Sequence, residues 1–107
     1  MKSSYIVIFI TAKDKDEAHK IARGLLEARL VACANILDGV TSVFWWEGKI
    51  DQAQEALIIL KSQKSKFKKI VAQVKKLHSY SVPEVISLPI VEGSKDYLNW
   101  VKQTTTL

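Results

Sequence analysis

Two residues of this 107-residue chain are the main candidates for binding a soft metal ion. His78 offers an imidazole, which binds copper and zinc, and Cys33 offers a thiolate, which binds soft copper. Each also has an ordinary structural role, because free cysteine is often a small buried residue and a histidine that ends a helix interacts favourably with its dipole. We predict that binding of Cu²⁺ or another divalent cation depends more on His78, whose ring we expect to reach solvent. Cys33 should be shielded between alanines in an apolar strand.

A second group combines aromatic and charged side chains at strand ends or in one loop. Its members are Trp46, Glu47, Glu55, Lys61, Tyr80, Pro83 and Glu84. Taken singly, each has a plain account: Glu47 flanks a turn, and Tyr80 closes an interface. As a group, with Pro83 fixing the loop, they are more typical of a small-ligand cleft. In a ring of subunits, they could meet in a cleft between chains.

Motifs for catalysis are weak in this sequence. No Ser-His-Asp or Cys-His spacing stands out, and the segment 10–14 has neither the glycine nor the arginine of an anion cradle. We therefore expect no enzymatic activity, and the alternative is a small ferredoxin-like enzyme acting on an anionic small molecule. An RNA-recognition module needs exposed aromatics on its central strands, and the strand at 55–61 has none. We expect no nucleic-acid partner.

Composition favours one domain spanning residues 1–107. The chain is 48% hydrophobic with four glycines and two prolines, which excludes a disordered chain. A single cysteine cannot form an internal disulfide, so we predict a reducing, cytoplasmic location. No apolar run is long enough to cross a membrane, and we expect no membrane insertion. The net charge of +5 comes largely from lysines between 64 and 76, which we interpret as a solvated helix face.

The first half of the chain alternates strand and helix signals. Residues 5–10 form a β-prone run, and Asp14 with Glu17 has the spacing of a helix capping box. Residues 31–46 are strand-like throughout and would span about 50 Å if straight, beyond ordinary strand lengths. Asp38-Gly39 must therefore turn the chain into a hairpin or form a bulge in one bent strand. The residue pattern leaves both open.

An aromatic strand end follows, and then the second half of the fold. Trp45 and Trp46 must face opposite sides of a strand, so both sides need a cover that a lone small domain rarely provides. Residues 47–49 reverse the chain. The remaining expected elements are a strand at 55–60, a helix from near Ser65, a loop at 79–84, a strand at 85–91 with Pro89 at an edge or bulge, and a short helix capped by Ser94.

The order βαββαβ plus a C-terminal helix predicts an α+β fold, a ferredoxin-like sandwich. Both crossover helices must lie on one side of the sheet, because such connections are right-handed. The strands are nonetheless apolar on both faces, where a sheet with one wet face would alternate. The uncovered face would exceed what a monomer tolerates, so we predict self-association with closed symmetry.

Four segments in order carry a family resemblance. They are Val31-Ala32-Cys33-Ala34-Asn35, Phe44-Trp45-Trp46-Glu47-Gly48-Lys49-Ile50, His78-Ser79-Tyr80-Ser81-Val82-Pro83-Glu84 and Asp96-Tyr97-Leu98-Asn99-Trp100. With this set, the chain resembles the CutA divalent-cation tolerance family from about residue 5 to residue 101. The resemblance implies a homotrimer, a bulge at Asp38-Gly39, and a role in copper tolerance or the response to metal ions. The family's likeness to the trimeric PII signalling proteins implies a PII-like small-ligand cleft.

The chain departs from the family at one place that matters for metal binding. Some members have a cysteine at the end of the first strand and paired histidines at the 79–84 loop. Those positions correspond to Ile10 and Leu77 here, so His78 is kept alone. The resemblance therefore implies at most a modest copper site within one chain.

Overall fold

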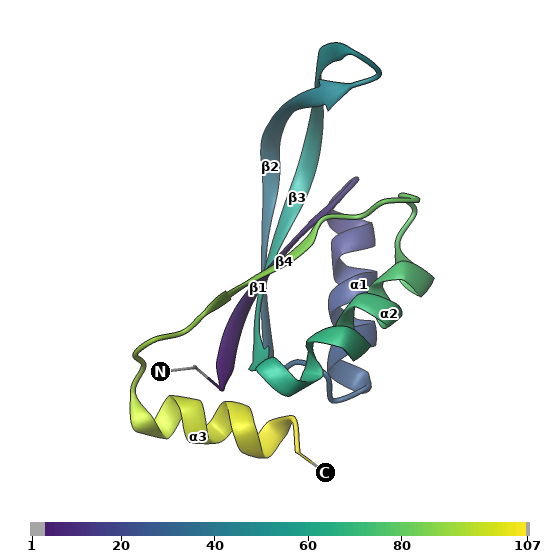
Figure 1. Ribbon diagram of the computed structural model, residues 1–107. Helices are drawn as coiled ribbons and strands as arrows, with labels where there is room; N and C mark the ends of the chain where they lie inside the picture. The colour runs from purple at the N-terminus through teal and green to yellow at the C-terminus, as the bar shows by residue number, and fades with distance from the viewer. Residues whose placement is uncertain (1–3, 107) are drawn as a thin grey trace.

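The computed structural model describes residues 4–106. Across them the elements run β1 (Tyr5–Ala12), α1 (Lys15–Glu27), β2 (Cys33–Trp46), β3 (Lys49–Gln63), α2 (Phe67–Leu77), β4 (Val85–Pro89) and α3 (Lys95–Thr104), with a 3₁₀ turn at Lys64–Lys66 before α2. The strands form one sheet in the order β2-β3-β1-β4, and every neighbouring pair is antiparallel. This is the predicted βαββαβ order followed by a C-terminal helix (Figure 1).

One face of the sheet is covered by α1 and α2, which lie side by side (Figure 1). Along β1, buried residues alternate with half-buried ones, as expected when one face packs against helices. Ile8 and Ile58 are fully buried on the covered face, together with Ile21 of α1 and Ile70 of α2. This cluster is the core that holds the two helices on the sheet.

The start of α1 is fixed by two acidic side chains. Asp14 is the N-cap, and its Oδ1 accepts a hydrogen bond from the Glu17 N–H at 2.8 Å. Glu17 Oε1 accepts the Lys13 N–H at 3.1 Å, one residue before the cap itself. The predicted capping box is therefore confirmed in its main feature, the hydrogen bond from the Glu17 N–H to the Asp14 side chain. The Glu17 side chain accepts from the Lys13 N–H and not from the N–H of the cap residue Asp14.

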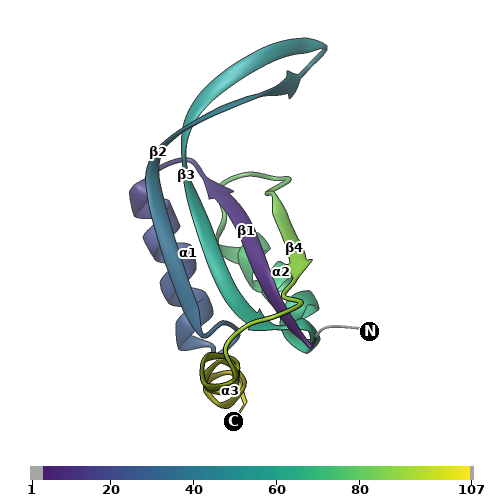
Figure 2. The same cartoon turned by 90° about the vertical axis from the view of Figure 1, so that its left-hand side faces the viewer.

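The opposite face of the sheet is partly bare. Leu37, Ile86 and Leu88 on that face are 46–51% exposed. In Figure 2 this face is toward the viewer, and α3, seen nearly end-on, lies at its lower end. There, the side-chain amide of Gln63 donates to Thr105 Oγ1 at 2.8 Å and fastens α3 to the end of β3. The predicted uncovered apolar face is thus present in the single chain.

The long β2–β3 hairpin rises beyond the rest of the sheet (Figure 1). The pairing shifts between Leu37 and Val40, with Gly39 at a φ of 70°, so Asp38-Gly39 is a bulge within one strand. That outcome matches the family resemblance and excludes a hairpin turn. At the tip, Trp46 pairs with Lys49, and both turn residues have positive φ, 50° at Glu47 and 77° at Gly48. This is the two-residue turn whose twist suits a hairpin.

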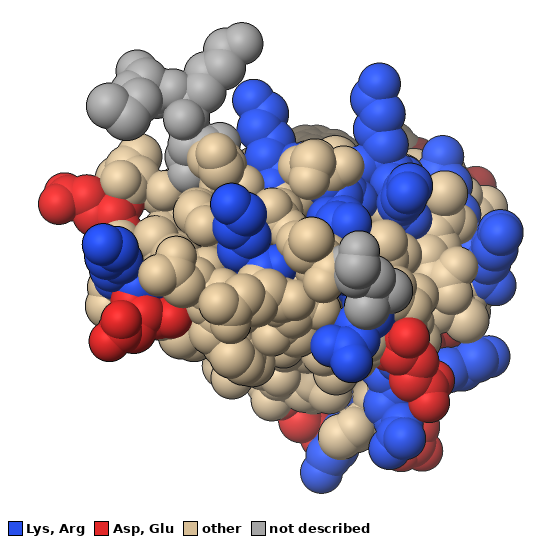
Figure 3. All heavy atoms as spheres, turned by 90° about the horizontal axis from the view of Figure 1, so that it is seen from below, with Lys and Arg blue, Asp and Glu red and all other residues tan. Residues whose placement is uncertain are grey.

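Two further predictions are confirmed, although β3 begins at Lys49 and not near residue 55, and β4 ends at Pro89 and not at residue 91. Pro89 lies on β4, which is an edge strand, and Ser94 caps α3 by accepting the Tyr97 N–H. The lysines of the 64–76 segment are exposed, apart from a half-buried Lys66. Seen from below, Lys and Arg side chains are spread around the lower end with acidic groups among them (Figure 3). No helix within residues 4–106 is long and apolar enough to cross a membrane.

Candidate functional site

Tyr80 and Glu55 meet where the hairpin leaves the sheet. Glu55 is 8% exposed in β3, and its Oε2 accepts a hydrogen bond from the Tyr80 hydroxyl at 2.7 Å. Tyr80 lies in the 79–84 loop between α2 and β4. Burial, followed by the Glu55 carboxylate, raises the pKa of Tyr80 to about 12. A tyrosine that stays neutral and donates to a carboxylate is a fixed polar element at this end of the sheet.

His78 lies directly beneath Tyr80, and its side chain is fully buried. Its Nδ1 accepts the Tyr80 backbone N–H at 3.0 Å, so the ring proton is on Nε2. Nε2–H then donates to the Thr11 carbonyl oxygen at 2.7 Å. The expectation that this ring reaches solvent is therefore wrong. Both ring nitrogens are engaged in hydrogen bonds, because the loop folds back over the ring.

Glu17 completes the cluster from the α1 side. Its Oε2 accepts the Ser79 N–H at 2.9 Å, and its Oε1 lies 3.8 Å from His78 Nδ1. Burial raises the pKa of Glu17, but the hydrogen bonds from Ser79 and Lys13 outweigh it. The net pKa of Glu17 is therefore below its usual value. This carboxylate is ionised at neutral pH and is held by backbone donors.

Lys61 and Cys33 form a separate group near the other end of the sheet. They pair across β2 and β3, with Lys61 Nζ 3.8 Å from Cys33 Sγ and hydrogen-bonded to Asn35 Oδ1. Burial and the neighbouring Cys33 raise the pKa of Tyr97 on α3. Cys33 is half-buried, so the expectation that it is shielded is not met in this chain. Six residues separate Lys61 from Glu55, about 20 Å along a strand, so one chain does not bring them together.

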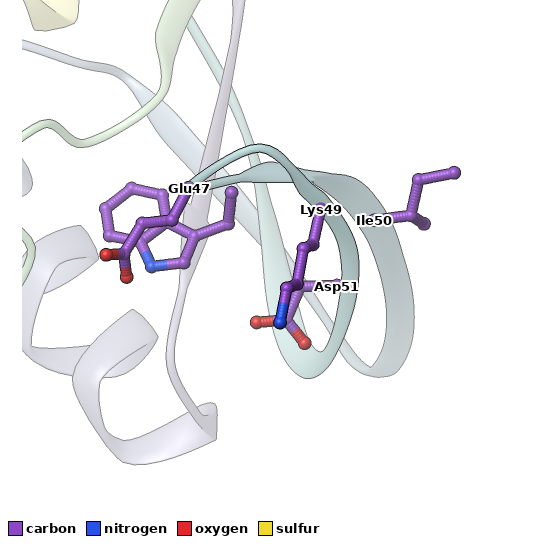
Figure 4. A pocket seen from close by; sticks show the side chains of 5 residues that line it. Glu47, Lys49, Ile50 and Asp51 are labelled. Atoms are coloured by element: carbon purple, nitrogen blue, oxygen red, sulfur yellow. The ribbon is translucent and has the colours of Figure 1, made fainter.

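Trp46 and Glu47 lie at the hairpin tip, also about 20 Å from Glu55 along β3. They line a shallow depression of about 470 Å³ with Lys49, Ile50 and Asp51. In Figure 4, Lys49 and Asp51 point to one side of the strand and Ile50 to the other. Trp46 is 59% exposed and Trp45 is 73% exposed. The tip therefore offers a large apolar surface that its own chain does not cover.

The seven predicted cleft residues thus fall into three places. Glu55 and Tyr80 are in contact, with Pro83 half-buried and Glu84 exposed in the same loop as Tyr80. Trp46 and Glu47 are at the tip, and Lys61 is with Cys33. Sequence reasoning treated Glu17 as a helix cap and missed its contact with the loop. The capping-box spacing was the only signal for it.

The donors present do not make a metal site within one chain. Among residues 4–106, no three His, Cys, Asp or Glu side chains are grouped so as to hold an ion. To bind an ion through its unprotonated Nδ1, His78 would have to give up the hydrogen bond from the Tyr80 N–H. Cys33 is half-buried while the His78 side chain is fully buried, so the accessibility that we expected of these two residues is reversed, and which of them binds an ion stays a prediction. A closed site would need donors from another subunit.

The fold and its polar cluster define a class: a small α+β protein with one antiparallel sheet, helices on one face and a long projecting hairpin. The family model described as "CutA1 divalent ion tolerance protein" matches residues 6–104. The chain belongs to this CutA1 divalent ion tolerance family, as the four sequence segments predicted.

Individual relatives support the same assignment. A Divalent-cation tolerance protein CutA of Thermus thermophilus is 42% identical over 99 residues, which cover 92% of this chain and 96% of the relative. The CutA structure from Archaeoglobus fulgidus, described as periplasmic, has a TM-score of 0.93 at 42% identity and covers 95% of this chain and 99% of its own. CutA1 from Oryza sativa has a TM-score of 0.94 at 39% identity, with 98% and 96% covered.

Proposed function

We propose that this protein is a non-enzymatic homotrimer of divalent-cation tolerance, which responds to metal ions by binding an ion or a small ligand between subunits. One observation carries the proposal: the sheet face opposite α1 and α2 and the hairpin tip are both apolar and exposed. Leu37, Ile86 and Leu88 are about half exposed on the face, and Trp45 and Trp46 are more so at the tip. Membership of the CutA1 family and the names of the relatives supply the cation-tolerance role.

The hairpin supports a cleft shared between chains. Seven residue pairs between β2 and β3 lie beyond the bulge, from the pair of Val40 and Glu55 to the pair of Trp46 and Lys49. Together they extend over about 20 Å of strand. That length is enough to carry Trp46 and Glu47 across an interface to the Glu55 and Tyr80 of a neighbour. Burying the face and the tip together should exceed the ~1,000 Å² expected of a biological contact. The ligand site would then be PII-like in its position between subunits.

A metal ion fits this proposal through Cys33 better than through His78. Cys33 is half-buried rather than fully buried, and thiolates are good ligands for soft copper. Its neighbour Lys61 is a competing positive charge at 3.8 Å, so we expect modest affinity. A cytoplasmic location remains a prediction from the single cysteine. One structural relative, from Archaeoglobus fulgidus, is described as periplasmic.

Native mass spectrometry of the metal-free protein tests the proposal. Wild type, Cys33→Ser and His78→Asn would each be titrated with Cu²⁺ and Zn²⁺, followed by a small-molecule extract. We expect a trimer that takes up Cu²⁺, with uptake reduced in Cys33→Ser and retained in His78→Asn. A monomer that binds neither ion nor small molecule would contradict the proposed function.

A further inference from the structure

We infer that Glu17 is a positioning residue that sets the conformation of the 79–84 loop, with the His78 ring as the second anchor. The inference rests on the proposed ligand site, because Tyr80, Pro83 and Glu84 are part of that loop. A residue of α1 would then determine the shape of a site that β3 and the loop form.

The contacts of the loop carry the inference. Beyond His78, the C-cap residue of α2, the next two backbone N–H groups, of Ser79 and Tyr80, both donate to side chains. The Ser79 N–H donates to Glu17 Oε2 at 2.9 Å, and the Tyr80 N–H donates to His78 Nδ1 at 3.0 Å. Side-chain acceptors at consecutive N–H groups fix the direction in which the chain leaves the helix.

Glu17 joins two segments that are 62 residues apart in sequence. One carboxylate oxygen accepts the Lys13 N–H and the other accepts the Ser79 N–H. Asp14 already caps α1 through its own contact with the Glu17 N–H. The second oxygen of Glu17 is therefore not needed for capping, and its contact with the loop is an additional role.

The same arrangement orients Tyr80. The His78 ring is held on β1 by the Thr11 carbonyl oxygen, and the Tyr80 ring packs on it with centroids 4.7 Å apart. In this position the Tyr80 hydroxyl reaches Glu55 Oε2. The loop is thus tied to α1, β1 and β3 within three residues of its start, and Glu17 is the first of these ties.

Glu17→Gln is the sharpest variant because it keeps the shape and one acceptor oxygen. Its amide nitrogen is a donor and would face one of the two N–H donors, so one contact must be lost. Asp16→Asn is the matched control, since Asp16 is an exposed acidic residue in the same turn of α1. Ser79→Pro is a second variant, which removes the loop N–H and leaves Glu17 unchanged.

Amide hydrogen exchange and ¹⁵N NMR of the ligand-free protein measure the result. In Glu17→Gln and Ser79→Pro, we expect the Tyr80 amide to exchange about tenfold faster, as for loss of one hydrogen bond. The ¹⁵Nδ1 signal of His78 should also shift, because Nδ1 loses its donor, while the β1 amides and Asp16→Asn stay unchanged. Unchanged Tyr80 exchange and an unchanged His78 signal in both variants would overturn the inference. Absence of ion or ligand uptake by wild type would contradict the proposed function alone.

Discussion

Two regions of this molecule meet the solvent in opposite ways. In the loop cluster, formed by Glu17, Glu55, His78 and Tyr80, polar groups from three segments are hydrogen-bonded to one another, to neighbouring backbone groups and to the Thr11 carbonyl oxygen of β1. Among residues 4–106, every buried side-chain nitrogen and oxygen has a hydrogen-bond partner. At the hairpin tip, residues 43–50, the large side chains Trp45, Trp46 and Ile50 are 59–73% exposed. One region is complete in a single chain, and the other is a large apolar surface that its own chain does not cover.

The difference separates two kinds of stability. Disruption of the contacts that Glu17 and His78 make within one chain should weaken each chain by the same amount at any protein concentration. Disruption of the hairpin tip should weaken assembly, so its effect should depend on concentration. Mutations in the two regions can therefore be told apart by the same melting experiment.

The largest effect is expected at the tip. Trp46→Ala should cost about 3–5 kcal/mol of assembly stability if the proposed interface buries the indole. Melting at two protein concentrations should show a concentration-dependent temperature for wild type and a lower, concentration-independent one for the variant. Lys69→Ala, at an exposed position of α2, is the control and should melt like wild type. An unchanged melting temperature in Trp46→Ala would place the indole outside any interface.

His78→Ala probes the loop cluster with a smaller loss. It removes the acceptor for the Tyr80 N–H and the donor to the Thr11 carbonyl. Leaving such groups unpaired costs about 1–3 kcal/mol each, and partial access to water should keep the total near the lower end. Chemical denaturation should report the same loss at every protein concentration. A loss of stability that grows on dilution would mean that the contacts of His78 belong to the interface between chains.

Tyr80→Phe sharpens the assignment through its pH dependence. The pKa of Tyr80 is raised from 10.0 to about 12, so the neutral phenol stabilises the folded chain. This contribution is fully present below pH 10 and is lost as pH rises to about 12. At pH 8 the variant should be less stable by about 1 kcal/mol, the size of one hydrogen bond. Equal pH profiles for both proteins between pH 8 and 12 would exclude the contact with Glu55.

Glu47→Asn should have the smallest effect, and it should be stabilising. Glu47 has a φ of 50°, and Asn-Gly is the preferred pair for this turn. Relief of the left-handed conformation should add less than about 1 kcal/mol, because Asn adopts it more readily. The substitution favours the turn and leaves Trp45 and Trp46 in place. The melting temperature should therefore rise slightly, and the proposed trimer should stay assembled. A fall would show that the Glu47 carboxylate makes a stabilising contact in the assembly.

The sequence predicted the elements well, because local patterns determine them. Alternation in β1, the cap at Asp14 and the edge position of Pro89 all follow from short-range chemistry. Asp38-Gly39 was ambiguous in isolation, since the same pair suits a turn or a bulge. Its outcome depends on the pairing of residues 40–46 with β3, which is a long-range property.

The site was predicted less well for the same reason. His78 looked solvent-accessible because it ends a helix, but its burial depends on Thr11, 67 residues away, and on the loop that folds over it. Glu17 was interpreted only as part of a helix cap. The contact of its second carboxylate oxygen with the Ser79 N–H was missed, because it forms only in the folded chain. Glu55 and Tyr80 are in contact within one chain, while Lys61 and the tip are separated from them along the strands, so the cleft between chains stays a prediction.

Sedimentation equilibrium of the full chain at micromolar concentration tests the central claim most directly. The claim is that the exposed face and hairpin tip of one chain are covered by other copies of the same chain. The account predicts a single species with three times the monomer mass, which dissociates in Trp46→Ala. A wild-type protein that sediments as a monomer would contradict it.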